Sequence, residues 1–234
     1  QQLPAISTIQ ESEEQMLARK HRVEEHLDLI GHVHNDVFKV AAASLPRQRG
    51  DVMMLVEHFR SHPLIIGFSN RHIYNKRLEI KRDPHAGRLV PFGSGLHQVH
   101  VRGQAGRRGR AGSWMNTEEG KVVLEKIQWV KQSAPHLSVG VVTPFAAQRD
   151  WLRDEVDGLG LASEVLVDTA YGFQGDERDV MFFSAVVARG ITPGACQWVE
   201  QPPNLINVAL TRAREALFVV ADFDFCRQQN GLLR

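Results

Sequence analysis

Four polar blocks of the sequence contain residue types that suit contacts with phosphate groups. The blocks are EHFRSHP at 57–63, TPFAAQ at 143–148, DTAYGFQGDERD at 168–179 and NVALTRAR at 207–214. An arginine can stabilise the negative charge that spreads over the γ-phosphoryl oxygens during phosphoryl transfer. Hydroxyl and amide side chains can hold nucleic-acid phosphates without reading the base sequence. Phosphate chemistry is therefore the first function to test against the rest of the chain.

The sequence does not contain the parts that would let this chain hydrolyse a nucleotide by itself. No G-x-x-x-x-G-K-[ST] loop occurs, and the Gly-Lys pair at Gly120-Lys121 is followed by Val122 within an expected helix. Such a loop cradles the phosphates, and a strand-borne Asp-Glu pair that would hold Mg²⁺ and orient the attacking water is missing as well. The isolated chain is therefore expected to show no ATPase activity.

The composition is that of an ordinary globular protein with nearly balanced charge. The 234 residues include 28 Lys and Arg against 27 Asp and Glu, and 43% are hydrophobic. This balance excludes a disordered polyelectrolyte, and it excludes an overall basic field as the main reason to bind nucleic acid. No apolar run approaches the roughly 20 residues that span a bilayer, so no membrane partner is expected. The N-terminus lacks a signal-peptide pattern and only Cys196 and Cys226 occur, which favours a cytoplasmic or nucleoid-associated protein.

Apolar runs and helical segments alternate over the second half of the chain. Four runs have the continuous apolar character of strands that are covered on both faces. They span residues 138–142, 164–168, 179–187 and 216–221. The alternation predicts one doubly wound α/β domain with a mostly parallel sheet flanked by helices, and residues 204–214 are expected to form one of these helices. Because such sheets bind ligands at the carboxyl ends of their strands, we expect the four blocks to gather at that edge.

The first half of the chain is more polar. Apolar residues within 9–30 recur at helical spacing and predict a surface helix. Asn116, with Glu119 three residues later, resembles a capping box at the start of another helix. Between these two expected helices, residues 102–112 are expected to form a mobile loop. This segment contains Arg102, Arg107, Arg108 and Arg110 and no acidic residue. This loop is either a nucleic-acid contact or a solvated flexible segment.

Histidine is abundant in the sequence, but its surroundings do not indicate a metal centre. His21, His26, His32 and His34 are accompanied by neither cysteine pairs nor an H-E-x-x-H sequence, so no metal site is expected. The tryptophans are expected to be packing residues, apart from Trp114 beside the basic loop, which could stack on a base.

The four blocks, in this order, resemble the second RecA-like motor domain of superfamily 1 helicases, in the branch that includes the nonsense-decay helicase. The family pattern is an aromatic-Arg-x-His-Pro block, T-P-x-x-x-Q, T-x-x-x-F-Q-G-x-E-x-D and N-V-A-x-T-R-A-R. This chain matches it from Phe59 to Pro63, at Thr143-Pro144 with Gln148, from Thr169 to Asp179, and from Asn207 to Arg214. The resemblance spans residues 50–222 and implies a RecA-like fold of the P-loop NTPase type that lacks the P-loop itself.

The first residues of the chain extend the resemblance. Gln1-Gln2-Leu3-Pro4 is similar to the tail of the G-D-x-x-Q-L-P motif, which ends the first motor domain of the family. The chain is therefore expected to begin inside this motif. We expect residues 1–50 to form an N-terminal helical segment after the motif, and residues 51–234 to form the second motor domain.

The resemblance implies a role for five residues at a nucleotide site. Arg60 and Arg212 would be the catalytic arginines that stabilise the transferred phosphoryl group, Gln2 would sense the γ-phosphate, and Gly175 and Glu177 would contact the ribose side of ATP. A first RecA-like domain of the same parent chain would hold most of the ATP and the Mg²⁺.

Four further residues would bind nucleic acid by the same resemblance. The track for a single strand would be lined by Thr143, Pro144, Thr169 and Gln174, and DNA is favoured over RNA. Two places depart from the family pattern: His58 stands where Gln is common, and Asn204-Leu205 stand where basic residues are common.

Helix geometry distinguishes the two arginines of the T-R-A-R sequence. Residues two apart on a helix point about 200° from each other, so Arg212 and Arg214 would not reach one phosphate from the same face. Arg212 shares the stripe of Leu205 and Val208, which faces neighbouring structure, and is the expected catalytic residue. The alternative is a structural salt bridge for Arg212.

The sequence thus predicts the C-terminal motor domain of an ATP-dependent helicase or translocase. The alternative is a non-catalytic nucleic-acid-binding or regulatory module that has a helicase-like fold.

Overall fold

Two compact units make up the chain, Leu3–Leu55 and a larger unit that contains Val56–Arg234, and each is described by itself. The computed structural model describes residues 10–31, 33, 35, 40–41, 55–87, 90–108, 112–173, 175–200, 204–229 and 231. Within these residues, no helix has the length and apolar character needed to cross a membrane. The domain boundary expected between residues 50 and 51 stays a prediction.

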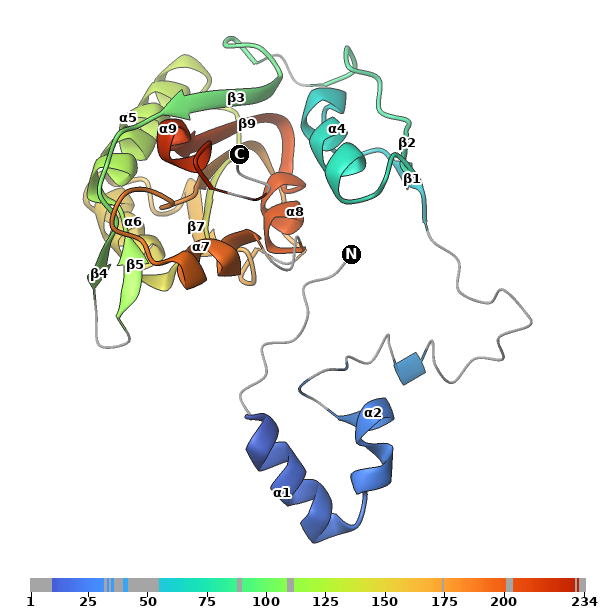
Figure 1. Cartoon of the computed structure of the whole chain (residues 1–234). Coiled ribbons are helices and arrows are strands. Elements are labelled where there is room, and N and C mark those ends of the chain that lie inside the picture. Colours follow the sequence, from blue (N-terminus) through green and yellow to red (C-terminus); the bar gives the residue numbers. More distant parts are fainter. Residues whose placement is uncertain are drawn as a thin grey trace. The chain divides into compact units, whose positions relative to one another are not determined.

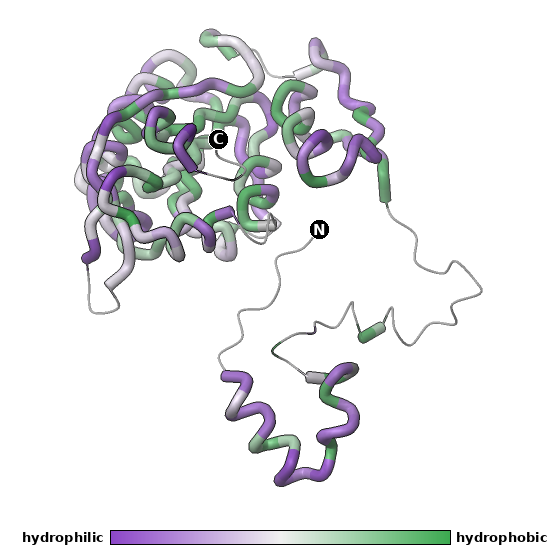
Figure 2. The backbone as a smooth tube through the Cα atoms, viewed as in Figure 1, coloured by the Kyte–Doolittle hydropathy of each residue, from purple (hydrophilic) through white to green (hydrophobic). Residues whose placement is uncertain are grey.

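The described part of the smaller unit is helical. It contains α1 (Glu11–His21), the 3₁₀ turn η1 (Glu24–His26) and α2 (Leu27–Ile30). The expected single helix over 9–30 is therefore wrong in its extent, because Arg22 adopts a left-handed backbone (φ 57°) that ends α1. Figure 2 shows α1 as mostly hydrophilic, as expected for a surface helix.

A five-stranded sheet forms the centre of the larger unit (Figure 1). Its strands follow the order β3-β9-β8-β6-β7, and each neighbouring pair is parallel. The bounds are β3 (Gly95–His100), β6 (Val139–Thr143), β7 (Val165–Thr169), β8 (Arg178–Ser184) and β9 (Ala213–Ala221). The last four strands coincide with the four apolar runs, so the predicted α/β class with a parallel sheet is confirmed.

Helices cover both faces of this sheet. On one face, α5 (Thr117–Ser133) and α6 (Ala146–Gly158) bury Val123, Ile127 and Leu152 against Phe182 and other residues of the strands. The alternate residues of β8 point to the opposite face, and Met181 is fully buried there as well. Two further helices, α4 (Pro63–His72) and α8 (Asn204–Leu210), pack against each other, and they also contact β9 and β8 respectively.

The remaining elements are short. β1 (Glu57–His58) pairs in parallel with β2 (Glu79–Ile80), and β4 (Gly106–Arg108) pairs antiparallel with β5 (Ser113–Met115). The helix α7 (Pro193–Glu200) packs on α8, and α9 (Phe223–Cys226) follows the last strand. The β4–β5 hairpin corrects the expectation of a mobile loop over 102–112, because Arg107 and Arg108 themselves lie in β4 and pair with Trp114 and Ser113 of β5.

The start of α5 confirms half of the predicted capping box. Asn116 Oδ1 accepts a hydrogen bond from the Glu119 backbone N–H at 3.2 Å, as an N-cap residue does. The Glu119 side chain does not bond back to the Asn116 backbone. It is fully buried and accepts from Ser184 Oγ at 2.6 Å and from the Val186 N–H at 2.9 Å. Glu119 is therefore part of a buried polar network between α5 and the end of β8.

Both cysteines are buried thiols, and Cys226 should be inert in the folded chain. Burial, followed by nearby carboxyl groups such as Glu119, raises the pKa of Cys226 to about 12. Since the thiolate is the reactive form, Cys226 at pH 8 should react with a thiol reagent about 10³-fold more slowly in the folded chain than in urea. Labelling of a Cys196→Ala variant measures this rate directly. Equal rates in the folded and unfolded chain would contradict the burial of this thiol.

Candidate functional site

The structure separates the four blocks onto two opposite edges of the sheet. Thr143 and Thr169 end β6 and β7 at the carboxyl edge, whereas Arg178 and Ala213 begin β8 and β9 at the amino edge. The expectation that all four blocks gather at the carboxyl edge is therefore wrong. The block at 168–179 itself runs from one edge to the other, because it contains the end of β7 and the start of β8.

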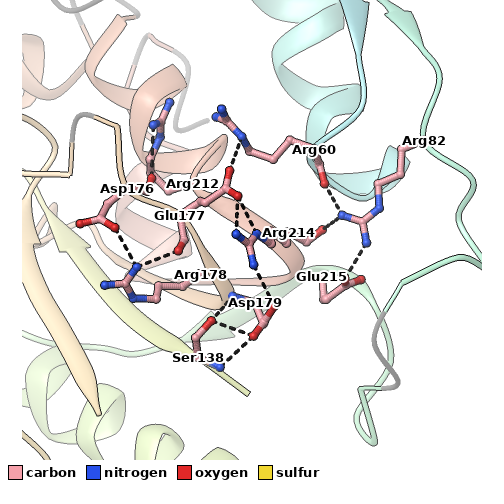
Figure 3. A network of polar contacts seen from close by, with 10 residues as sticks. All are labelled: Arg60, Arg82, Ser138, Asp176, Glu177, Arg178, Asp179, Arg212, Arg214 and Glu215. Atoms are coloured by element: carbon pink, nitrogen blue, oxygen red, sulfur yellow. Dashed lines mark hydrogen bonds and ion pairs between the residues drawn. The ribbon is translucent and has the colours of Figure 1, made fainter. Parts of the chain in front are cut away.

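At the amino edge, Glu177 joins arginines from two different blocks (Figure 3). Its Oε2 atom lies 2.5 Å from Arg60 Nε, and its Oε1 atom accepts from Arg214 Nε at 2.8 Å. The hydrogen bond to Glu177 is the main cause that raises the pKa of Arg214 above its ordinary value. Arg60 comes from the segment before α4 and Arg214 from β9, so one carboxylate fixes segments that are far apart in the sequence.

Arg212 occupies a different environment from Arg214. Its Nε donates to the Val208 carbonyl at 3.2 Å and its Nη1 to the Asp176 carbonyl at 3.3 Å. Among the described residues, no carboxylate lies within 4.0 Å of its guanidinium. Burial, followed by the positive charge of Arg60, lowers the pKa of Arg212. Arg212 is thus a half-buried cation close to a second cation, and no described carboxylate neutralises it directly.

The geometric reason given for choosing Arg212 over Arg214 is wrong, although the two side chains do differ. The helix expected over 204–214 ends at Leu210, Arg212 lies in a turn, and Arg214 lies in β9. The two residues are distinguished by their partners rather than by a helix face. Arg214 forms the ion pair with Glu177, whereas the structural salt bridge considered for Arg212 is not found among the described residues.

Gly175 and Glu177 flank the carbonyl that Arg212 binds. Gly175 has a left-handed backbone (φ 96°), which glycine adopts without steric cost, and it places Asp176 beside the turn of Arg212. Two other expected residues lie outside the described residues. They are Gln2, expected at the nucleotide site, and Gln174, expected on the nucleic-acid track. The structure therefore brings Arg60, Arg212 and Glu177 together, with Gly175 in the adjoining turn.

Arg82 and Glu215 of this edge were not singled out from the sequence, and Asp179 was named only as the last residue of a matched block. Arg82 donates to the carbonyl oxygens of Arg60 and Arg214 and, at 2.6 Å, to Glu215 Oε1. Asp179 is buried and accepts from Ser138 N and Oγ at 2.9 and 2.7 Å. Arg82 lies 132 residues from Arg214, so no local spacing could have indicated this contact.

These residues line a pocket of about 620 Å³ at the amino edge. Its walls include Phe59, Arg60, Glu177, Arg214 and Glu215. Phe59 exposes 64% of its surface beside the charged groups. Three arginines (Arg60, Arg82 and Arg214) and three carboxylates (Glu177, Asp179 and Glu215) line this pocket, so its formal charge is balanced. Arg212 does not line the pocket, but it lies near Arg60 and adds one cation to this edge, which suits an anionic ligand.

His58, which departs from the family pattern, has a structural role in this structure. Its Nε2 accepts from the Ser61 backbone N–H at 2.9 Å and so stabilises the turn that carries Arg60. Burial, followed by the charges of Arg60 and Arg82, lowers the pKa of His58. The ring is therefore neutral at pH 7, which keeps this nitrogen available as an acceptor.

The residues predicted to bind nucleic acid lie at the carboxyl edge and are largely covered. Thr143 and Pro144 are buried, and Thr169 is half-buried. Gln148 of the same block is also buried and donates to the Asn116 carbonyl at 3.2 Å and to Ser184 Oγ at 3.0 Å. The block at 143–148 thus anchors α6 to β8 and α5, while Thr169 offers the most accessible of the three predicted contacts.

One group of potential metal ligands occurs among the described residues. Ligand atoms of His100, Asp222 and Asp224 lie within 4.8 Å of one another. Asp222 accepts from the Phe225 N–H, and Asp224 pairs with Arg102 at 3.2 Å and Arg227 at 3.0 Å. These contacts explain the cluster as a helix cap with surface ion pairs, and the expectation of no metal site stays a prediction.

Comparisons with known proteins identify relatives among helicases. Residues 37–224 match a family described as an AAA domain. The "Probable helicase senataxin" of Mus musculus is 31% identical over 179 residues, which cover 72% of this chain and 6% of that protein. The protein of the same name from Homo sapiens is 29% identical over 176 residues, which cover 72% of this chain and 6% of that protein.

More distant relatives extend this comparison. The "Helicase sen1" of Schizosaccharomyces pombe is 27% identical over 183 residues, which cover 73% of this chain and 11% of that protein. The chain therefore spans only a small part of the length of these curated relatives. Among solved structures, "The structure of PRRSV helicase" matches with a TM-score of 0.36 and 15% identity, over 77% of this chain and 26% of that one.

Proposed function

Because the chain belongs to the superfamily 1 helicases, within the AAA domain family that residues 37–224 match, we propose that it is the second, C-terminal RecA-like motor domain of an ATP-dependent helicase. The parent protein would join this chain to a first RecA-like motor domain, and ATP would bind between the two. The parent would act on single-stranded nucleic acid in the cytoplasm or nucleoid, with DNA favoured over RNA.

The observation that carries this proposal is the pairing of Arg60 and Arg212 at one edge of the sheet. Arg60 is bound by Glu177, whereas Arg212 is held only by carbonyl oxygens among the described residues. Burial, followed by the positive charge of nearby Arg60, lowers the pKa of Arg212, and the two cations repel each other. Phosphate oxygens placed between them would relieve this repulsion, which supports a triphosphate as the ligand.

ATP hydrolysis would use these groups as electrostatic stabilisers. As the γ-phosphoryl group leaves, negative charge spreads over its oxygens, and the guanidinium groups of Arg60 and Arg212 would stabilise that charge. Glu177 would accept hydrogen bonds from the ribose while it keeps Arg214 in place. Closure of the two domains around ATP would bring these groups to the phosphates, and hydrolysis would release the closed state.

The residues of this edge fit phosphate oxygens but do not fit Mg²⁺. Glu177 and Glu215 are bound by arginines, and Asp179 is bound by Ser138, so the carboxylates already have partners. When bound, Mg²⁺ neutralises phosphate charge. We therefore assign the ion to ligands of the first motor domain, and the isolated chain is expected to hydrolyse no ATP.

Replacing Arg60 by alanine in the parent protein tests this function. We expect the nucleic-acid-stimulated kcat to fall by about 10²-fold or more, because one preorganised donor to the developing charge is lost. Arg71→Ala, which removes an exposed cation from the last turn of α4, is the matched control and should leave kcat within about twofold. Steady-state ATPase assays with saturating single-stranded DNA provide the measurement.

The result also separates the two functional classes. A kcat that stays close to the wild-type value in Arg60→Ala would reject a shared ATP site. A parent protein that binds single strands normally but shows no ATPase before any substitution would favour the non-catalytic binding module instead.

A further inference from the structure

The hairpin of β4 and β5 presents arginines for which the amino-edge site gives no role. Both Arg107 and Arg108 in β4 are exposed. Arg189, which follows β8 in sequence, is exposed as well. From Arg102 to Met115 the sequence contains no acidic residue. This surface therefore concentrates positive charge on a protein whose overall charge is close to neutral.

Two backbone contacts place the hairpin over the carboxyl edge of the sheet. The Ala147 N–H, just after the Thr143-Pro144 pair, donates to Ser113 Oγ of β5 at 3.2 Å. The Ala105 N–H, just before β4, donates to the Arg189 carbonyl at 2.8 Å. These contacts join the hairpin to the segments that follow β6 and β8. The hairpin thus adjoins the same edge that carries Thr143 and Thr169.

The register of the hairpin separates its two arginines. Arg108 lies opposite Ser113, and Arg107 lies opposite Trp114. Directly opposed residues of an antiparallel pair share one face, so Arg108 is on the face of Ser113, which contacts the segment after β6. The Arg107 guanidinium instead lies over the Trp114 ring, 5.0 Å from its centroid. Arg107 is thereby engaged in packing, while Arg108 faces the carboxyl edge.

Neither Arg108 nor Arg189 has an acidic partner in the part of the chain that the structure describes, since no carboxylate there lies within 4.0 Å of either guanidinium. Their neighbour Arg102 differs, because it pairs with Asp224 at 3.2 Å. An exposed cation that no protein carboxylate neutralises gains most from a polyanion, which releases counterions on binding.

We propose that Arg108 and Arg189 bind the phosphate backbone of single-stranded nucleic acid where it crosses the carboxyl edge of the sheet. This inference deepens the proposed helicase function and rests on it. A single strand fits better than an acidic protein segment, because the hairpin adjoins the edge where Thr169 lies, the accessible one of the described residues that are expected to bind nucleic acid. The two arginines would lengthen the track without reading sequence.

The salt dependence of binding measures these contacts one phosphate at a time. Each lost contact to a single strand should lower the slope of log K against log salt by about 0.7. We expect the variant with both Arg108→Gln and Arg189→Gln to lower the slope by about 1.4 when fluorescence anisotropy follows binding of a 20-nucleotide oligo-dT to this chain. Replacement of both residues by lysine should restore most of the slope, because the charge is kept.

Two controls match the test. Arg107→Gln removes one charge from the other face of the same hairpin, and it should change the slope by less than about 0.3 because that face does not meet the proposed track. The variant with both Arg71→Gln and Arg77→Gln removes two exposed arginines near α4, which lies far from β4 and β5 in Figure 1. It should likewise change the slope by less than about 0.3. Far-UV circular dichroism confirms that each variant is folded.

An unchanged slope in the Arg108→Gln and Arg189→Gln variant would overturn the inference, as would a chain that binds no oligo-dT even at low salt. A loss of poly-glutamate binding with normal oligo-dT binding would also overturn it and would assign the surface to an acidic protein. Because this readout needs no ATP, it is independent of the Arg60→Ala assay. If the Arg108→Gln and Arg189→Gln variant lowered the slope while Arg60→Ala kept a normal ATPase activity, the nucleic-acid contact would be supported and the motor function would be rejected.

Discussion

Replacing Arg212 by alanine in the parent protein is expected to lower the nucleic-acid-stimulated kcat by about 10³-fold or more. The guanidinium is half-buried, lies near Arg60 and, among the described residues, has only carbonyl partners. Its charge is therefore available to the transferred phosphoryl group, and a cation in such a site is worth more than one in open water.

The same substitution should have little effect on folding. Arg212 contributes two hydrogen bonds to carbonyl oxygens, each worth about 1 kcal/mol, and no described ion pair depends on it. We therefore expect the effect to fall on kcat, with urea unfolding of the variant shifted by no more than about 2 kcal/mol. Arg212→Lys should recover only part of the rate, because lysine keeps the charge but not the planar fork.

Arg214→Ala provides the contrast that the structure itself suggests. It removes the partner of Glu177 and, at 3.6 Å, of Asp179, so it should disturb the position of Glu177 rather than remove the transition-state charge. We expect a loss of about tenfold in kcat, well below that of Arg212→Ala. Equal losses in both variants, or a larger one in Arg214→Ala, would reject the assignment of Arg212.

Four of the five strands of the sheet could be predicted from the sequence because buried strands have a continuous apolar composition. The runs that became β6, β7, β8 and β9 are apolar on both faces, and a strand covered by helices on both sides has no other composition available. The apolar pattern does not predict the residues at which neighbouring strands begin and end. The pairing of Ala213 with Arg178 extends β9 into the T-R-A-R sequence, and that long-range pairing overrides the local helical pattern.

The sequence predicted which residues form the candidate site, but it did not predict at which edge of the sheet they lie. Arg60, Arg212 and Glu177 were expected at one nucleotide site through the family resemblance, and the structure places them at one sheet edge. It is the amino edge, because the chain crosses the whole sheet between Thr169 and Glu177. Contacts such as Arg82 to Glu215 depend on that crossing, and no sequence period encodes them.

Glu119 should make the stability of the folded chain depend on pH in the direction opposite to that of a salt-bridged carboxylate. Burial raises the pKa of Glu119 to about 8, against 4.5 in an exposed chain. The folded state therefore holds a proton that the unfolded state releases between these two values. The contribution of Glu119 is complete below pH 4.5 and is lost as the pH rises through 8, by about 1.4 kcal/mol per pH unit.

The network around Glu119 shows why the protein keeps this carboxyl group. Its oxygens accept from Ser184 Oγ and from the N–H of Val186, a β-branched residue held at a left-handed φ of 64°. Glu119→Ala would leave both donors buried without an acceptor, and we expect the unfolding free energy to fall by about 3 kcal/mol or more. This loss should appear at pH 5, where the group is protonated in the folded state.

Glu119→Gln isolates the proton from the hydrogen bonds, because the amide oxygen can still accept from Ser184 and Val186 and carries no charge at any pH. Relative to the wild type, this variant should gain about 3 kcal/mol in unfolding free energy between pH 5 and pH 7.5. Urea unfolding at both values measures the difference, and Glu118→Gln, at the exposed neighbouring position, should show almost none. If the stability of Glu119→Gln and of the wild type changed in parallel with pH, Glu119 would have to be ionised in the folded chain. The buried network would then be held by a charge rather than by a protonated carboxyl group.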